Sequence, residues 1–225
     1  MSKFTAIVLA GGSGKRMQSD IPKQYMMLGD KPMLAYSLIA FEESGVDDVV
    51  IVCRLGDEEY IRKDFVGKYN LQKVSAIVHG GEERFDSVFE GIKACGNTDY
   101  VLIHDGARPY ISKDIIENNI SGVLEYNAVV TAVASTDTIK IANSDKTVKN
   151  TPDRSTCYSI QTPQSFRIDI IKEAFAKFYE AKKQGRLSVS ITDDSMLVEE
   201  FTDYPVRIID GEYTNIKITN PSDIK

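Results

Sequence analysis

Short hydrophobic runs alternate with longer amphipathic stretches along the first 134 residues of the chain. Runs without regular polar alternation are typical of strands that are covered on both faces of a parallel sheet. Such runs predict strands at 4–9, 49–53, 74–78, 100–103 and 128–134. Because helices are expected between them, the sequence predicts an α/β fold with a mostly parallel central sheet flanked by helices.

Three of the intervening stretches carry hydrophobic residues at helical spacing. The first is expected to begin with Pro32 as its first helical residue and to end at Gly45. The second follows the glycine corner at 80–81, and the third begins after Ser112, a suitable N-cap. Their inward faces are predicted to carry Leu34, Leu38 and Phe41, then Val88, Ile92 and Cys95, then Ile116, Ile120 and Val123.

The alternation of strand and helix breaks after residue 134. Hydrophobic and polar residues alternate over 136–149 around Asn143-Ser144-Asp145, which indicates a β-hairpin. We expect a projecting arm at about 136–155 that contributes to a homodimer; an edge ribbon folded back on its own domain is the alternative. A helix over 170–178, a helix capped by Thr192, a strand at 206–209 and a helix start at Pro221 follow.

Composition limits the classes of protein to consider. A chain of 225 residues with 42% hydrophobic and 27% charged residues suits one globular domain over 1–225. The net charge of −6 argues against a general nucleic-acid surface. Three widely spaced cysteines without a Cys-x-x-Cys pair favour a reducing compartment over a disulfide framework or a zinc site. No signal peptide or membrane-length apolar run is evident, so we expect a cytoplasmic protein without a membrane partner.

The segment after the first strand, LAGGSGKRMQSDIPKQ, combines glycines with basic side chains. Gly11, Gly12 and Gly14 allow backbone N–H groups to approach a ligand, and such donors suit phosphate oxygens. Positive charge from Lys15, Arg16 and Lys23 points to a nucleoside triphosphate. A strand-to-helix turn with merely solvated basic residues is the alternative, although Pro22 stiffens the segment that directs Lys23.

Two commoner glycine motifs do not fit this loop. A Walker A loop requires a glycine where Leu9 stands and a serine or threonine where Arg16 stands. The dinucleotide fingerprint fails because its third glycine position is Met17.

Further candidate residues follow other predicted strands, where ligands of open α/β sheets lie. Around Gly81, small residues and the hydroxyl of Ser87 are suited to reading a nucleobase edge, but a plain turn and helix cap explain them almost as well. Asp105, after the fourth strand, is well placed to hold Mg²⁺ against phosphates. Arg108 is either its ion-pair partner or a ligand contact, and His104 is predicted to be a packed histidine rather than a metal ligand or base.

Cations and hydroxyls scattered along the second half suggest another anionic site. We expect Arg154, Lys217, Thr138 and Thr192 to line it, because phosphate recognition favours such a mixture. Individually these residues are weak signals: Lys217 could be surface charge, and Asp193 and Asp194 could simply favour a helix N-terminus. No Cys-His or Ser-His pair has a recognisable spacing. Because a phosphate nucleophile is already an anion, the residues indicate phosphoryl or nucleotidyl transfer by alignment and charge neutralisation.

Eight motifs in order make the chain resemble the 2-C-methyl-D-erythritol 4-phosphate cytidylyltransferases of the non-mevalonate isoprenoid pathway. They cover nearly the whole chain: LAGGSGKRM with PKQ, GGEERFDSV, HDGARP, DTIK, DRS, QTPQSF, TDDS and NIKIT. The resemblance implies a Rossmann-like nucleotidyltransferase fold with a β-arm that builds a homodimer. It also implies transfer of CMP from CTP to 2-C-methyl-D-erythritol 4-phosphate with Mg²⁺ and release of pyrophosphate.

The resemblance also implies roles for residues at matching positions. Arg16 and Lys23 would stabilise charge on the α-phosphate, and Asp105 would be the residue associated with Mg²⁺. Arg154 and Lys217 would position the polyol phosphate, with Thr138 and Arg154 acting across the dimer. The expected nucleotide-binding set is Ala10, Gly11, Gly12, Ser13, Gly14, Lys15, Gly81, Glu82, Arg84, Ser87, Asp105 and Gly106. The expected substrate-binding set is Thr138, Arg154, Thr162, Thr192, Lys217, Thr219 and Arg108.

Two departures and two rival functions complete the predictions. Gly11 stands where many family members have alanine, and Gly106 where alanine or serine is usual; we expect neither to matter chemically. The nearest rival is ribitol-5-phosphate cytidylyltransferase of teichoic acid synthesis, which shares PKQ and QTPQSF, whereas DTIK, DRS and TDDS favour the erythritol enzyme. A non-catalytic nucleotide sensor is the rival from another class, and the presence of both Lys23 and Lys217 argues against it.

Overall fold

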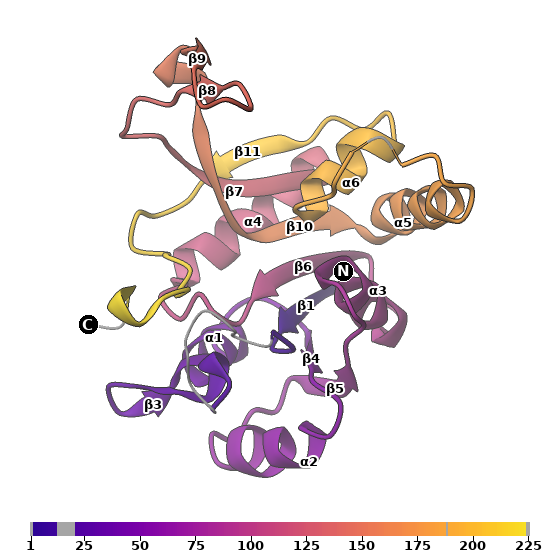
Figure 1. The fold of residues 1–225 in the computed structure, drawn as a ribbon. Helices are drawn as coiled ribbons and strands as arrows, with labels where there is room; N and C mark the ends of the chain where they lie inside the picture. Colours follow the sequence, from indigo (N-terminus) through magenta and orange to yellow (C-terminus); the bar gives the residue numbers. More distant parts are fainter. Residues whose placement is uncertain (1, 13–20, 188, 224–225) are drawn as a thin grey trace.

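The computed structural model describes residues 2–12, 21–187 and 189–223 and is built around a seven-stranded sheet (Figure 1). The strand order is β11-β7-β10-β6-β1-β4-β5. Only the pairs that β10 makes with β6 and β7 are antiparallel in this sheet. The predicted α/β fold with a mostly parallel sheet is therefore confirmed.

Six of the seven strands lie where the hydrophobic pattern predicts them. They are β1 (Phe4–Leu9), β4 (Asp48–Cys53), β5 (Val74–His79), β6 (Tyr100–Asp105), β7 (Ala128–Ala134) and β11 (Arg207–Asp210). The seventh, β10 (Tyr158–Arg167), was not predicted as a strand and contains the QTPQSF motif. A small separate hairpin is formed by β2 (Met27–Leu28) and β3 (Lys31–Pro32).

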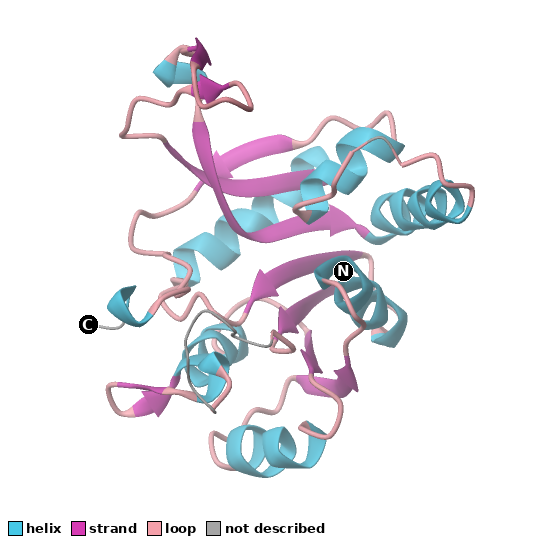
Figure 2. Ribbon diagram, viewed as in Figure 1, coloured by secondary structure: helices cyan, strands magenta, loops and turns pink. Residues whose placement is uncertain are grey.

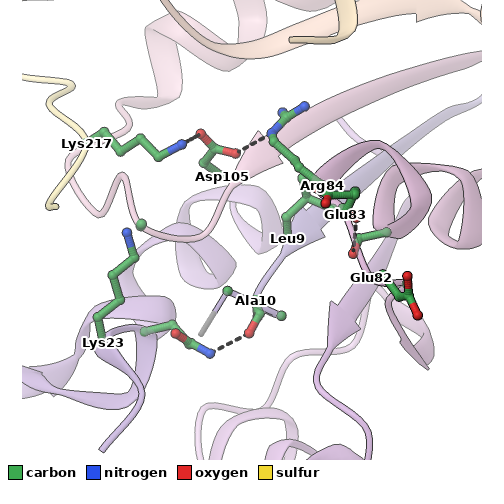
Figure 3. A pocket seen from close by; sticks show the side chains of 14 residues that line it. Leu9, Ala10, Lys23, Glu82, Glu83, Arg84, Asp105 and Lys217 are labelled. Carbon is green, nitrogen blue, oxygen red and sulfur yellow. Dashed lines mark hydrogen bonds and ion pairs between the residues drawn. The ribbon is translucent and has the colours of Figure 1, made fainter. Parts of the chain in front are cut away.

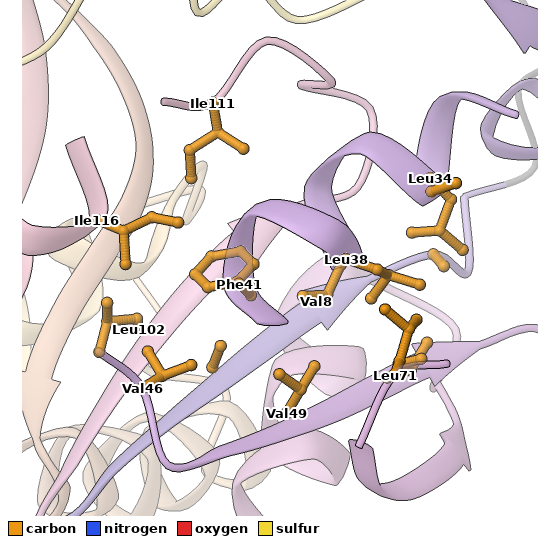
Figure 4. Packing of buried hydrophobic residues seen from close by; sticks show 14 of the residues in the cluster. Val8, Leu34, Leu38, Phe41, Val46, Val49, Leu71, Leu102, Ile111 and Ile116 are labelled. Carbon is orange, nitrogen blue, oxygen red and sulfur yellow. The ribbon is translucent and has the colours of Figure 1, made fainter. Parts of the chain in front are cut away.

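Helices cover both faces of the sheet (Figure 2). On one face, α1 (Met33–Glu42) and α4 (Lys113–Tyr126) pack with Phe41, Val8 and Leu102 into one buried cluster (Figure 4). On the other face, α3 (Arg84–Ala94), α5 (Ile168–Lys183) and α6 (Asp194–Phe201) enclose a second cluster. Burial on both faces is the reason why the strands are uninterrupted hydrophobic runs. Within the described ranges, no helix combines the length and apolar character needed to cross a bilayer.

Several helix boundaries differ from the sequence predictions. Pro32 belongs to β3 and directly precedes α1, which ends at Glu42 rather than at Gly45. Asp193, not Thr192, caps α6, since its carboxylate accepts the N–H of Met196 at 2.9 Å. The predicted cap at Ser112 is confirmed by the N–H of Ile115, which donates to its hydroxyl at 3.1 Å. Among the described residues, the sequence did not predict α2 (Glu58–Ile61), the π-helical turn η3 (Arg62–Gly67) or the short turns η2 (Lys23–Tyr25) and η4 (Arg154–Thr156).

The predicted hairpin is present between β7 and β10. Its strands are β8 (Ile141–Ala142) and β9 (Val148–Asn150), and the N–H of Asn143 closes the turn on the carbonyl of Thr147 at 2.9 Å. Figure 1 shows this arm projecting beyond the ends of β7 and β10, away from β1, β4 and β5. Residues 139–151 of the arm are exposed to solvent, and Pro152 is half-buried.

The sheet changes its direction of growth between β1 and β6. From β1 the chain adds β4 and β5 on one side, and it then returns to place β6 on the other side of β1. In open α/β sheets, ligands bind beyond the carboxyl ends of the strands at such a switch point. Leu9 and Asp105 end β1 and β6 in register, so the loops that follow them open at the same place.

Candidate functional site

A pocket of about 350 Å³ opens beyond the carboxyl ends of β1 and β6 (Figure 3). Its walls come from five segments of the chain: the loop after β1, the turn at Lys23, the loop and helix start after β5, the loop at Asp105 and the loop at Lys217. The lining residues are Leu9, Ala10, Gly11, Gly12, Lys23, Gln24, Gly81, Glu82, Glu83, Arg84, Ser87, Asp105, Ala107 and Lys217. The predicted nucleotide loop and the predicted Lys217 therefore share one pocket.

Lys23 reaches this pocket because its neighbours anchor the short turn η2 (Lys23–Tyr25). Gln24 is buried and donates from Nε2 to the carbonyl of Ala10 at 2.6 Å. The ammonium of Lys23 donates to the carbonyl of Ile218 at 2.9 Å. Lys23 is thereby held between the loop after β1 and the segment that carries Lys217.

Four charged side chains form a continuous row that starts in one wall of the pocket, where Figure 3 shows Lys217, Asp105 and Arg84, and ends behind that wall at Asp194. The Nζ of Lys217 lies 2.7 Å from Oδ2 of Asp105, and the Nε of Arg84 lies 3.3 Å from Oδ1 of the same carboxylate. The two terminal nitrogens of Arg84 continue the row to both carboxylate oxygens of Asp194, at 2.8 and 2.7 Å.

Asp105 is ionised in this row. Burial opposes ionisation of its carboxyl, but the positive charges of Arg84 and Lys217 outweigh burial and hold its pKa well below the usual range. In contrast, burial raises the pKa of Asp194 in spite of its pairing with Arg84. The pocket thus presents cations on a frame of carboxylates, and such an arrangement suits an anionic ligand.

The loop after β5 serves both the pocket and helix α3. Glu83 and Asp86 form a capping box at the start of α3, which agrees with the helix-cap interpretation of this motif. Gly81, Glu82 and Ser87 nevertheless line the pocket, and the hydroxyl of Ser87 donates to the carbonyl of Glu83 at 3.2 Å.

The HDGARP segment divides into pocket and core. Asp105 lines the pocket, whereas Arg108 is buried and donates to the carbonyls of Asn215 at 2.7 Å and Ile160 at 3.3 Å. Arg108 neither lines the pocket nor lies within ion-pair distance of Asp105. His104 is fully buried, its imidazole contacts Thr162 and the carbonyl of Arg108, and burial lowers its pKa to about 4. The predicted packed histidine is confirmed.

The remaining predicted substrate residues are not gathered at this pocket within one chain. Thr138 and Arg154 lie on or beside the exposed arm, where Arg154 contacts the carbonyl of Thr136. Thr192 is exposed, and Thr219 bonds to Asp223. Thr162 is buried beneath the pocket, where its hydroxyl accepts the N–H of Asp105 at 3.1 Å. Gly106 adjoins the pocket without lining it.

Four predicted nucleotide-loop residues, Ser13, Gly14, Lys15 and Arg16, lie outside the described residues. Three polar residues of the site region, Gln24, Glu83 and Asp194, have no predicted site role. Gln24 and Glu83 belong to the motifs PKQ and GGEERFDSV, and Asp194 is expected only to favour a helix start. The sequence feature that could have identified them is a polar side chain next to a motif residue. The hydrogen-bond partners of Gln24 and Asp194 cannot be found in this way, because residue spacing does not reveal distant contacts.

The family model for 2-C-methyl-D-erythritol 4-phosphate cytidylyltransferase matches residues 4–225. A curated relative of that name from Lachnoclostridium phytofermentans is 48% identical over 224 residues, which cover 100% of this chain and 94% of the relative. A relative of the same name from Lachnospira eligens is 47% identical over 222 residues, covering 98% and 96% of the two chains.

Solved structures agree with this assignment. The 4-diphosphocytidyl-2C-methyl-D-erythritol synthase of Anaerococcus prevotii has a TM-score of 0.84 and 35% identity, covering 99% of this chain and 95% of its own. The 2-C-methyl-D-erythritol 4-phosphate cytidylyltransferase of Thermus thermophilus has a TM-score of 0.74 and 26% identity, covering 97% and 94%. The family model spans almost the whole chain, and the relatives match from end to end. The chain therefore belongs to the 2-C-methyl-D-erythritol 4-phosphate cytidylyltransferase family.

Proposed function

We propose that this chain transfers CMP from CTP to 2-C-methyl-D-erythritol 4-phosphate and releases pyrophosphate, a step of isoprenoid precursor biosynthesis. The observation that carries the proposal is the convergence of Lys23 and Lys217, 194 positions apart, on one pocket at the switch point of the sheet. Together with family membership, this arrangement supports an enzyme that holds two phosphorylated substrates side by side.

The reaction requires alignment and neutralisation of charge more than proton transfer. The phosphate of the polyol is an anion at neutral pH and attacks the α-phosphate of CTP, while pyrophosphate leaves in line. Lys23 stabilises the charge that develops on the α-phosphate, and Arg16 is assigned the same role from the sequence. Lys217 holds the attacking phosphate beside it. Ala10, Gly11, Gly12, Gly81 and Ser87 surround the nucleoside.

The pocket fits a divalent cation that is held mainly by substrate. Mg²⁺ is typically bound by one or two carboxylates together with substrate phosphates and water. Asp105 meets this requirement, because each of its oxygens makes one bond to a cation and retains a further lone pair. Asp105 would hold the Mg²⁺, which would supply positive charge that neutralises part of the charge on the phosphates of CTP. Among the described residues, no group of three or more carboxylate, histidine or cysteine side chains offers an alternative metal site.

We further propose a cytoplasmic homodimer, in which each single-domain chain lends its arm at about 136–155 to its partner. The arm leaves its own pocket without Thr138 and Arg154, and it exposes Ile139, Ile141 and Val148 to solvent. Exposed hydrophobic side chains gathered on a projecting element are typical of a subunit contact. The arm residues would complete the polyol-phosphate site of the other subunit.

A pyrophosphate-release assay tests the function directly. CTP, ATP, GTP and UTP are each combined with 2-C-methyl-D-erythritol 4-phosphate or with ribitol 5-phosphate in the presence of Mg²⁺. We expect turnover with CTP and the erythritol phosphate. Faster turnover with ribitol 5-phosphate would instead support the rival enzyme, which the names of the relatives do not favour. CTP binding without turnover in any combination would support the non-catalytic sensor.

A further inference from the structure

The side chain of Asp194 is a buried carboxylate that the proposed reaction does not use. It is only 1% exposed and lies behind the pocket wall rather than in it. A buried charge is costly unless a partner compensates it. Both oxygens of Asp194 are bonded to Arg84 in a bidentate pair, at 2.8 and 2.7 Å. This geometry fixes direction as well as charge, because the guanidinium is planar and rigid.

The capping of helix α6 does not account for this carboxylate. Asp193 supplies the capping oxygen to the N–H of Met196. Gln164, from β10, accepts the N–H groups of Asp194 and Ser195 on its amide oxygen, at 3.0 and 2.8 Å. The free N–H groups of this helix start are thus bonded to other side chains. The oxygens of Asp194 are left for Arg84.

Because the guanidinium of Arg84 is held in place, the carboxylate of Asp105, which its Nε–H contacts, is held in place as well. With both Nη atoms held by Asp194, the Nε–H of Arg84 points to Oδ1 of Asp105, and Oδ2 of Asp105 remains for Lys217. Carboxylate and cationic side chains thus alternate along this row. Without the side chain of Asp194, Arg84 and Lys217 would compete for the single carboxylate of Asp105.

We propose that Asp194 is a positioning residue of the pocket: it clamps Arg84 and thereby keeps the Asp105 carboxylate and the Lys217 ammonium in place for the polyol phosphate. The inference rests on the proposed function, because it assigns the consequence to the polyol-phosphate half of the reaction. The sequence-based expectation for Arg84 is nucleotide binding. In this proposal, Arg84 links the carboxylates of Asp194 and Asp105.

The test compares Asp194→Asn with Asp193→Asn, which removes the same charge one residue earlier and retains a capping side chain. Initial rates are measured while CTP and 2-C-methyl-D-erythritol 4-phosphate are varied separately. For Asp194→Asn we expect KM for the polyol phosphate to rise about tenfold or more, and KM for CTP to rise less, although Asp105 would also hold the Mg²⁺ that serves CTP. Asp193→Asn is expected to stay within about twofold of the wild type. A fall in kcat with both KM values unchanged would indicate a loss of folded enzyme and would overturn the proposal.

A second variant covers the case in which Asp194→Asn does not fold. In Arg84→Met/Asp194→Leu, apolar side chains replace the buried pair, a change that proteins often tolerate. We expect a similar rise in KM for the polyol phosphate, because Asp105 has lost its link. Wild-type kinetics in this double variant would refute the positioning role.

A spectroscopic measurement separates the clamp from the proposed reaction. The Nε–H signal of Arg84, identified in ¹⁵N spectra by its absence in Arg84→Lys, should exchange slowly with water in the wild type and at least tenfold faster in Asp194→Asn. Equal exchange would overturn the clamp even if the enzyme is active. A wild type that shows slow exchange but no turnover would refute the proposed function and leave the clamp standing.

Discussion

A Cβ atom added at Gly106 would lie 2.8 Å from Cδ1 of Leu34 and 2.9 Å from the carbonyl oxygen of Leu9. Both neighbours are fixed, since Leu34 is fully buried and the carbonyl of Leu9 accepts the N–H of Gly106 at 3.0 Å. At Gly11 the nearest atom would be the carbonyl oxygen of Cys53 at 3.4 Å, an ordinary contact. The sequence-based expectation concerned only the chemistry of the two glycines; the structure adds that Gly106, unlike Gly11, has no room for a methyl group.

We therefore expect opposite results from alanine at these two positions. Gly106→Ala should lower the free energy of unfolding by about 1–3 kcal/mol, because the added methyl group overpacks a filled region. Gly11→Ala should change the free energy of unfolding by less than about 0.5 kcal/mol, or raise it slightly, because alanine restricts the unfolded chain. Urea denaturation of both variants at one protein concentration measures the difference. Equal stabilities would show that Leu34 and the β1 carbonyl yield more easily than their burial suggests.

At the residue scale, the sequence predicted which residues line the pocket better than it predicted the side-chain pairs between distant positions. Glycines after β1 and an aspartate at the end of β6 are recognisable because a parallel sheet brings strand ends to one edge. Lys23, expected beside a triphosphate, and Lys217, expected in a second anionic site, both line this pocket. The pairing of Arg84 with Asp194, 110 positions away, leaves no trace in spacing. Arg108 is a motif residue that was expected near the ligand or Asp105, but its guanidinium instead donates to backbone carbonyls in the protein interior.

At the element scale, β10 shows where hydrophobic periodicity fails. Its central residues, 161–165, read QTPQS and are all buried. Polar side chains are tolerated there because they are bonded: Thr162 to Asp105 and His104, Gln164 to the start of α6, and Ser165 to Asn119. A strand of this kind is defined by its tertiary partners rather than by its own propensity. Helices α3 and α4 were predictable because each has an apolar face and an identifiable start.

Asn119 joins three elements and provides a test of this view. From α4 it donates to the hydroxyl of Thr131 on β7 at 2.8 Å, and it accepts the hydroxyl of Ser165 on β10 at 2.7 Å. Asn119→Ala should cost about 1–3 kcal/mol in the free energy of unfolding, since it leaves the buried hydroxyl of Ser165 without its acceptor and that of Thr131 without its donor. Asn118→Ala, at an exposed position of the same helix, is the matched control and should change it by less than about 0.5 kcal/mol. Equal effects in urea denaturation would mean that water replaces the amide of Asn119.

At the scale of the whole molecule, the arm raises the question of which pocket it serves. Thr138 and Arg154 lie away from the pocket of their own chain, whereas Lys23 lines it. If the arm completes the partner's site, each functional site combines Lys23 of one subunit with Arg154 of the other. A C2 dimer then has two such composite sites.

Subunit complementation can decide this arrangement. Lys23→Ala should lower kcat roughly 10²-fold or more, because it removes transition-state stabilisation, and Arg154→Ala should lower kcat/KM for the polyol phosphate at least about tenfold. The two variants, carrying different affinity tags, are coexpressed, and the mixed dimer is isolated by purification on both tags. One of its two sites then combines an intact Lys23 with an intact Arg154, so we expect about half of the wild-type activity. If each arm served its own chain, both sites would be defective and the mixed dimer would remain as inactive as its parents.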